Sequence, residues 1–160
     1  TRIRVALSNG ELDEAARSLG RPYHICGRVG HGHKRGRKLN FPTINIYLHR
    51  RVSPILGVFA VKVHGLSPEP WPGVANVGNR PTITHDDRYL LEVHLLGFDE
   101  EVYGKQVKIE FVERIRSEQK FESLDKLTRR IQMDADRARE IFGIEQPNGL
   151  SFDPVDSQLN

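Results

Sequence analysis

The sequence predicts a mainly β protein of one domain, a small antiparallel barrel with a helix at its C-terminal side. Six short apolar runs, each bounded by turn residues rich in glycine and proline, predict six strands. Helical spacing of apolar residues occurs near the two ends of the chain. Because closing a sheet removes its exposed edges, six such strands in 160 residues favour a barrel.

The elements follow in order along the chain. A short helix is predicted over 11–19, where apolar residues recur at helical spacing before Gly20. A longer helix is predicted after the N-cap Ser123, with an apolar stripe from Leu124 to Phe142 and an end at Gly143; we expect it to lie across the barrel. Residues 146–160 show little periodicity and predict a loosely held tail. The six predicted strands are Tyr23–Val29, Thr43–Tyr47, Gly57–His64, Gly73–Val77, Tyr89–Leu96 and Gln106–Arg114.

Length and charge narrow the function classes. A chain of 160 residues is too short for two domains of ordinary size. A net charge of +3 permits an anionic small molecule without requiring nucleic acid. No apolar run approaches the roughly 20 residues of a membrane-spanning helix. The single cysteine, Cys26, excludes an intrachain disulfide and fits a reducing compartment, so we expect a cytoplasmic protein. We expect Cys26 to be buried in its strand.

The segment Gly27–Asn45 joins a basic, glycine-rich loop to the start of a strand. Its sequence is GRVGHGHKRGRKLNFPTIN. Glycines let backbone N–H groups approach a ligand closely, and the lysines and arginines attract phosphate oxygens, so the loop predicts a polyanion site. A solvated loop and a nucleic-acid contact are open readings of the same residues, because neither the P-loop nor the Rossmann glycine spacing is present.

The strand that follows Pro42 offers two oxygen ligands. Thr43 and Asn45 stand two residues apart, so their side chains project to the same side of a strand. A hydroxyl and a carboxamide at that spacing suit magnesium.

A carboxylate stands on another predicted strand. Glu92 alternates with Leu91 and Val93 and therefore projects away from the face that those apolar residues cover. It is either a solvent-facing strand residue or a general base that deprotonates a hydroxyl attacking a phosphoryl group. His31 and His33 form the densest histidine pair, but they lack further ligands at zinc-site spacing.

Two further segments could form ligand walls. Asn76 and Arg80 lie in a glycine- and proline-framed stretch that is either a turn connection or a polar wall. Arg116, Glu118 and Phe121 precede the last helix and could hold a flat aromatic ligand or form a surface ion pair.

Taken in order, these segments resemble the riboflavin kinase family, specifically the kinase module of bacterial bifunctional riboflavin kinase/FMN adenylyltransferase. The resemblance extends from about Gly20 to Gly143. The blocks that carry it are Gly27–Val29, His31–Gly32, Arg35–Arg37, Phe41–Asn45, Gly57–Val61, Gly73–Gly78, Arg80–Thr82, Glu92–Leu96, Tyr103–Lys105 and Arg116–Phe121.

The resemblance implies a six-stranded Greek-key barrel that phosphorylates the ribityl 5′-hydroxyl of riboflavin with Mg-ATP to give FMN and ADP. It implies Thr43 and Asn45 as ligands of Mg²⁺ and the ATP phosphates, and Glu92 as the base. The residues expected to cover the ATP phosphates are Gly30, His31, Gly32, Lys34, Gly36 and Arg37. Those expected on the flavin side are Asn76, Arg80, Arg116, Glu118 and Phe121.

The sequence departs from the family's pattern at two positions and extends beyond it at the N-terminus. Ile44 stands where the family has alanine, and Asn40 stands before Phe-Pro-Thr where glycine is usual; we expect Ile44 to point away from the two proposed ligands.

Residues 1–20 resemble the end of an adenylyltransferase module, so we expect a kinase domain over 21–145 that is natively fused to that module and does not itself adenylylate FMN. The alternatives are a basic β-barrel that binds single-stranded nucleic acid and a flavin-binding module without turnover.

Overall fold

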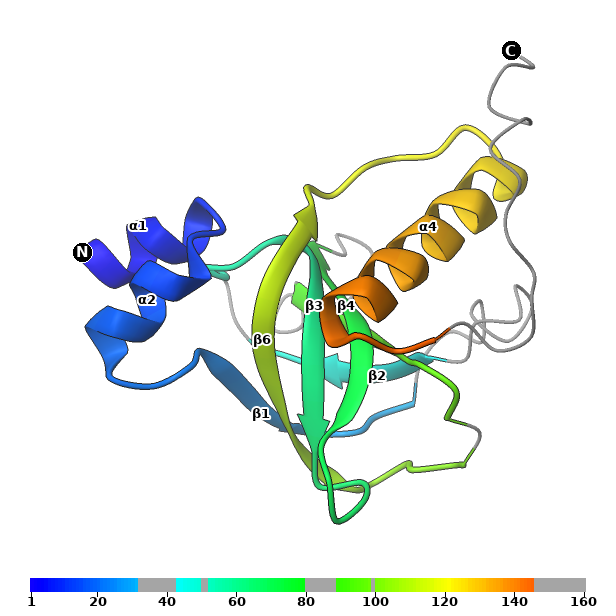
Figure 1. Cartoon of the computed structure of the whole chain (residues 1–160), viewed down its shortest axis with the longest axis horizontal. Coiled ribbons are helices and arrows are strands. Elements are labelled where there is room, and N and C mark those ends of the chain that lie inside the picture. Colours follow the sequence, from blue (N-terminus) through cyan, green and yellow to red (C-terminus); the bar gives the residue numbers. More distant parts are fainter. Residues whose placement is uncertain (32–42, 50–51, 80–88, 99, 146–160) are drawn as a thin grey trace.

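The computed structural model of the chain describes residues 1–31, 43–49, 52–79, 89–98 and 100–145. Two short helices precede six strands, and a long helix follows them (Figure 1). In chain order the elements are α1 (Arg2–Ser8), α2 (Leu12–Leu19), β1 (His24–Arg28), β2 (Thr43–Tyr47), β3 (Gly57–His64), β4 (Trp71–Asn79), β5 (Tyr89–Leu95), β6 (Gln106–Arg116) and α4 (Leu124–Phe142).

The six strands form one antiparallel sheet in the order β1-β6-β3-β4-β5-β2. Strands β3, β4 and β5 are sequential neighbours, and β6 returns to lie beside β3, which is a Greek-key connection. An antiparallel bridge between Gly30 and Asn45 brings the chain after β1 against β2. The sheet is therefore a nearly closed barrel, and the predicted Greek-key barrel is confirmed.

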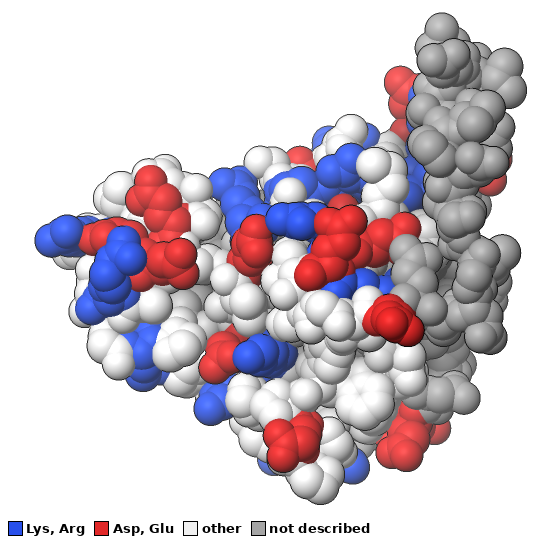
Figure 2. Space-filling view, viewed as in Figure 1, with Lys and Arg blue, Asp and Glu red and all other residues white. Residues whose placement is uncertain are grey.

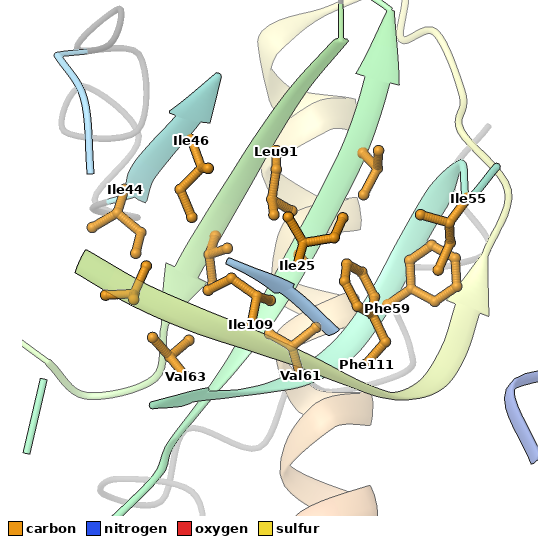
Figure 3. Close-up of a cluster of buried hydrophobic side chains, with 14 of the residues drawn as sticks. Ile25, Ile44, Ile46, Ile55, Phe59, Val61, Val63, Leu91, Ile109 and Phe111 are labelled. Carbon is orange, nitrogen blue, oxygen red and sulfur yellow. The ribbon is translucent and has the colours of Figure 1, made fainter. Parts of the chain in front are cut away.

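Apolar side chains from alternate strand positions fill the barrel (Figure 3). Phe59, Val61 and Val63 of β3 are completely buried, and Phe59 meets Phe111 of β6 edge to face at a centroid distance of 5.3 Å. Ile44 also belongs to this core, so the prediction that it points away from the Thr43 and Asn45 side is confirmed. The core positions leave the alternate residues of β2, β4 and β5 on the outer face of the barrel.

The C-terminal helix lies across β3, β4 and β6, as the sequence predicts (Figure 1). The Ser123 hydroxyl caps it by accepting a hydrogen bond from the backbone N–H of Lys126 at 3.2 Å. Its buried residues Ala135 and Ala138 lie in a second apolar cluster with Val58 and Ala60, the outward-facing residues of β3. Small side chains at this contact allow the helix to approach the sheet closely. Strand β3 is therefore covered on both faces.

The structure differs from the sequence predictions at one helix, two strands and Cys26. The helix α1 was not predicted, because a run of seven residues gives too short a pattern; it is held by packing of Ala6 and Leu7 in the main core. Strands β4 and β6 are longer than the predicted Gly73–Val77 and Gln106–Arg114. The expectation that Cys26 is buried was wrong: Ile25 takes the inward position of β1, so Cys26 faces outward and is exposed.

Helices of the described residues are either too short or too polar to cross a membrane.

Candidate active site

The sheet register aligns most of the predicted site residues in one line across the barrel. Arg116 of β6 pairs with Val58 of β3, and Val58 pairs with Asn76 of β4. Asn76 pairs with Glu92 of β5, Glu92 pairs with Asn45 of β2, and Asn45 bridges to Gly30. We call Arg116, Val58, Asn76, Glu92, Asn45 and Gly30 the cross-strand row.

The row lies on the outer face of the barrel. Residues on either side of it along the strands, such as Ile44, Val77 and Leu91, belong to the core, so the row residues project the opposite way. Neighbouring strands lie about 4.8 Å apart, so Glu92 is roughly 14 Å along the sheet from Arg116 and roughly 10 Å from Gly30. Glu92 therefore stands between the predicted flavin-side and phosphate-side residues.

Strand β2 carries the two oxygen donors that the sequence predicts as metal ligands. Thr43 pairs with His94 and Asn45 pairs with Glu92, so a hydroxyl, a carboxamide and a carboxylate share one patch on two adjacent strands. Asn45 is only 7% exposed, although it faces away from the core. These positions bring together the proposed metal ligands and the proposed base.

Asn76 contributes an unusual polar atom to the patch. Its Oδ1 is buried and has no hydrogen-bond partner among the described residues. An unpaired buried acceptor costs about 1–3 kcal/mol, so a donor or a cation at this position would be stabilising. Asn76 lies directly beside Glu92 in the cross-strand row.

The beginning of the glycine-rich loop is fixed to β2. The backbone N–H of Gly30 donates to the carbonyl oxygen of Asn45 at 2.8 Å, and the Tyr47 hydroxyl donates to the carbonyl oxygen of His31. The His31 ring stacks on Tyr103 at a centroid distance of 3.6 Å. The loop thus starts beside the metal-ligand candidates. Other predicted residues, namely Gly32, Lys34, Gly36, Arg37 and Arg80, lie outside the described residues, as does Asn40.

Arg116, at the other end of the row, forms an ion pair with a residue that the sequence did not indicate as part of the site. Its Nε and Nη2 donate to the carboxylate of Asp134 on α4 at 2.8–3.0 Å, and its guanidinium lies 5.6 Å from the centre of the Phe121 ring. The carboxylate of Glu118 lies against Gly78 of β4, where a Cβ atom would come within 1.9 Å of Oε1. Arg116 is therefore packed against α4, Glu118 against β4, and Phe121 against the Arg116 guanidinium.

Asp134 had a signal in the sequence. It lies three residues after Ile131 and four before Ala138, within the apolar stripe of the helix. A charged residue in such a stripe is rarely buried unless it is paired. Tyr47 also had a signal, because it continues the two-residue spacing of Thr43 and Asn45.

The face of the molecule that carries α4 does not present an extended positive surface. On the face that carries α4, positive and negative side chains are interspersed (Figure 2). Surface pairs such as Arg137 with Glu140, at 2.9 Å, account for part of this mixture. This face does not favour the nucleic-acid-binding alternative, since that function needs a positive groove with exposed aromatic residues.

Two grooves among the described residues lie away from the row. One of about 540 Å³ separates α2 from β6, and one of about 640 Å³ lies between Trp71 and the end of α4 near Ile144. Neither is lined by a residue of the cross-strand row. Among the described residues, no group of three or more His, Cys, Asp and Glu side chains is arranged to hold a metal.

The fold and this site place the chain in the class of six-stranded Greek-key barrels that carry a polar site on the outer face beside a C-terminal helix. The chain belongs to the riboflavin kinase family, because the Flavokinase (riboflavin kinase) family model matches residues 19–142.

Relatives of known name agree with this family. The chain is 51% identical over 142 residues to a bifunctional riboflavin kinase/FMN adenylyltransferase of Haemophilus influenzae, covering 89% of this chain and 46% of that protein. It is 47% identical over 147 residues to the protein of the same name from Escherichia coli K12, covering 92% and 47%. The chain therefore spans about half the length of the curated relatives it matches.

Two solved structures share the fold. A riboflavin kinase from Trypanosoma brucei superposes with a TM-score of 0.55 at 26% identity, over 87% of this chain and 91% of that one. A structure named as a macrolide-efflux protein from Streptococcus pneumoniae superposes with a TM-score of 0.75 at 33% identity, over 86% of this chain and 45% of that one.

Proposed function

We propose that this chain phosphorylates riboflavin at the ribityl 5′-hydroxyl, with Mg-ATP as the phosphoryl donor and FMN and ADP as products. The observation that carries the proposal is the cross-strand row. Glu92 lies in the middle of the row. On one side of it are Asn45 and Gly30, where the glycine-rich loop begins, and on the other side are Asn76 and Arg116. A kinase needs this order, with the base between the acceptor and the phosphate donor.

The nucleotide phosphates would lie at the Asn45 and Gly30 end of the row. There the loop that begins at Gly30 starts against β2, and its remaining residues are basic and glycine-rich in sequence. The flavin ring would lie toward Asn76 and the Glu118 to Phe121 segment. The ribityl chain would then run along the row and bring its terminal hydroxyl to Glu92.

The residues of β2 fit a magnesium ion. Thr43 and Asn45 offer neutral oxygen donors on one side of the strand, and magnesium commonly takes few protein ligands beside phosphate oxygens and water. Bound there, the ion would neutralise charge on the β- and γ-phosphates.

The chemical step is a direct transfer. The Glu92 carboxylate accepts the proton of the ribityl 5′-hydroxyl as that oxygen forms its bond to the γ-phosphorus. The bond from the γ-phosphorus to the bridging oxygen breaks at the same time, and ADP leaves with the electron pair. Asn45 and Gly30 would hold the phosphate donor in place while this occurs, because the backbone hydrogen bond between them ties Gly30 to β2.

The setting of this activity follows from the relatives. Because the chain matches about half of each curated bifunctional relative, we also propose that it works in fusion with an N-terminal FMN adenylyltransferase module and does not itself adenylylate FMN. A reducing, cytoplasmic setting is proposed from the single cysteine.

The test is an assay of the chain with riboflavin, ATP and MgCl₂, in which FMN is separated by chromatography and ADP is measured independently. We expect equal amounts of FMN and ADP, dependence on riboflavin, and loss of both products with EDTA. Riboflavin binding without either product would support the flavin-binding alternative and contradict the kinase. Controls are the reactions without ATP and without riboflavin.

A further inference from the structure

We infer that Asp134 of α4 is a positioning residue that sets riboflavin affinity by holding Arg116 and the segment that follows it. This inference rests on the proposed function, because it assigns the flavin end of the same site. Asp134 lies on a helix outside the barrel and would touch neither the phosphates nor the reacting oxygen. Its effect would pass through Arg116, the last residue of β6.

The contact between the two side chains is strong and buried. The Arg116 Nε donates to both carboxylate oxygens of Asp134 at 3.0 Å, and Nη2 donates to Oδ2 at 2.8 Å. The side chains are 11% and 4% exposed. A two-point contact between an arginine and a carboxylate fixes the plane of the guanidinium as well as its distance.

A second arginine makes Asp134 the centre of a small cluster. Arg130, one turn earlier on α4, places its Nε 3.5 Å from Oδ1 of Asp134, and this Nε is buried without a hydrogen bond to the described residues. Two arginines thus depend on one buried carboxylate. Replacing the Asp134 carboxylate by a neutral group removes the charged partner of both arginines. Arg116 would then no longer be held in one orientation.

The fixed guanidinium in turn holds the segment 117–121. The Arg116 Nη1 donates to the carbonyl oxygen of Ser117 at 3.1 Å, and the guanidinium lies over the ring of Phe121. Between these two points the Glu118 carboxylate reaches Gly78, on the same outer face of β4 as Asn76. The segment therefore forms a wall beside the part of the cross-strand row that runs from Arg116 to Asn76.

This arrangement changes the role expected of Arg116. A guanidinium with its Nε and Nη2 engaged by Asp134 and its Nη1 engaged by Ser117 is an anchor for the wall. Small displacements of a substrate wall can be costly, since about 1 Å of misplacement can reduce a rate about 10²-fold. Asp134 is thus expected to affect the flavin and to leave ATP binding nearly unchanged.

The test compares Asp134→Asn with Asp136→Asn, the same change two residues further along the same helix on a side chain that is 23% exposed. Riboflavin affinity is measured by quenching of its fluorescence, which needs no turnover, and KM for ATP is measured in the assay. We expect Asp134→Asn to raise the Kd for riboflavin about tenfold, with KM for ATP within about twofold of the unchanged chain. Asp136→Asn should change neither quantity.

A double-mutant cycle separates positioning from general damage to the fold. In an Arg116→Met background, which has no positive charge at this position, adding Asp134→Asn should raise the Kd for riboflavin by less than about twofold, because the contact that it removes is already lost. Additive effects, or an unchanged Kd in a folded Asp134→Asn chain, would overturn the inference. If Asp134→Asn does not fold, Asp134→Glu is tested instead, because it keeps the charge and moves the carboxylate. It should also raise the Kd for riboflavin, and an unchanged Kd would overturn the inference.

The proposed kinase activity and the role of Asp134 can be contradicted separately. A chain that binds riboflavin but forms no FMN contradicts the proposed function and leaves the binding test of Asp134 intact. A chain that forms FMN while Asp134→Asn binds riboflavin with an unchanged Kd contradicts only the role of Asp134.

Discussion

At the scale of single residues, the account depends on three polar side chains on two adjacent strands. Thr43, Asn45 and Glu92 lie on the outer face because their neighbours Ile44 and Leu91 are in the core. The two-residue period of a strand made this arrangement predictable from the sequence, and the register that places Asn45 opposite Glu92 had to come from the structure.

The first prediction concerns the base. Glu92→Gln keeps the size of the side chain and removes its ability to accept the hydroxyl proton, so kcat should fall about 10²- to 10⁴-fold. Glu113→Gln, the same change at an exposed residue of β6 whose partner is Arg137, should leave kcat within about twofold. Undiminished turnover of the Glu92 variant would remove this residue from the chemistry.

The second prediction concerns the metal ligands. Thr43→Val replaces a hydroxyl by a methyl group of similar size, so the Mg²⁺ concentration for half-maximal activity should rise by about tenfold or more. Thr128→Val on α4, where the hydroxyl only donates to the Leu124 carbonyl oxygen, is the matched control. An equal Mg²⁺ requirement in both variants would argue against Thr43 as a ligand.

At the scale of the elements, the helix α4 has two roles. It covers the outer face of β3 and β4 through Ala135 and Ala138, and it carries the carboxylate that holds Arg116. The apolar stripe of the helix predicted its position across the barrel. The contact between Asp134 and Arg116 could not be predicted, because it depends on how α4 and the end of β6 meet in the folded chain.

The third prediction tests the helix contact. Ala138 is completely buried, so Ala138→Leu should overpack the contact and lower the free energy of unfolding by about 1–3 kcal/mol, measured with denaturant. Met133→Leu is a control on the same helix, because Met133 is 52% exposed and should change stability by less than about 0.5 kcal/mol. Equal stabilities would contradict the described packing.

The fourth prediction tests the contact between β4 and the wall after β6. Gly78→Ala introduces a Cβ atom 1.9 Å from the position of Glu118 Oε1, so Glu118 must move. KM for riboflavin should rise several-fold, by roughly 1 kcal/mol of binding, while KM for ATP stays the same. Adding Glu118→Asp shortens the side chain and should recover part of the loss; a double variant no better than the single one would mean that the collision is not the cause.

At the scale of the whole molecule, the site is a product of barrel topology. The residues of the cross-strand row lie between positions 30 and 116 of the chain, and antiparallel pairing across five strands aligns them. The number of strands and the C-terminal helix could be predicted from local patterns. The alignment of Arg116 with Asn76 and Glu92 could not, since it depends on β6 returning beside β3 and on register shifts within that pair.

Under the proposed function, the order of the row also predicts how the two substrates would approach. Riboflavin would enter from the α4 side and ATP from the Gly30 side, so that the two meet at Glu92.

The most direct measurement is a crystal structure of the chain with riboflavin, ADP and Mg²⁺ bound. The account predicts the isoalloxazine ring beside Asn76 and the Glu118 to Phe121 segment, the ribityl 5′-hydroxyl within hydrogen-bond distance of Glu92, and the ADP phosphates with Mg²⁺ at Thr43 and Asn45. A structure with the two ligands at exchanged ends of the row, or with the 5′-hydroxyl out of reach of Glu92, would contradict it.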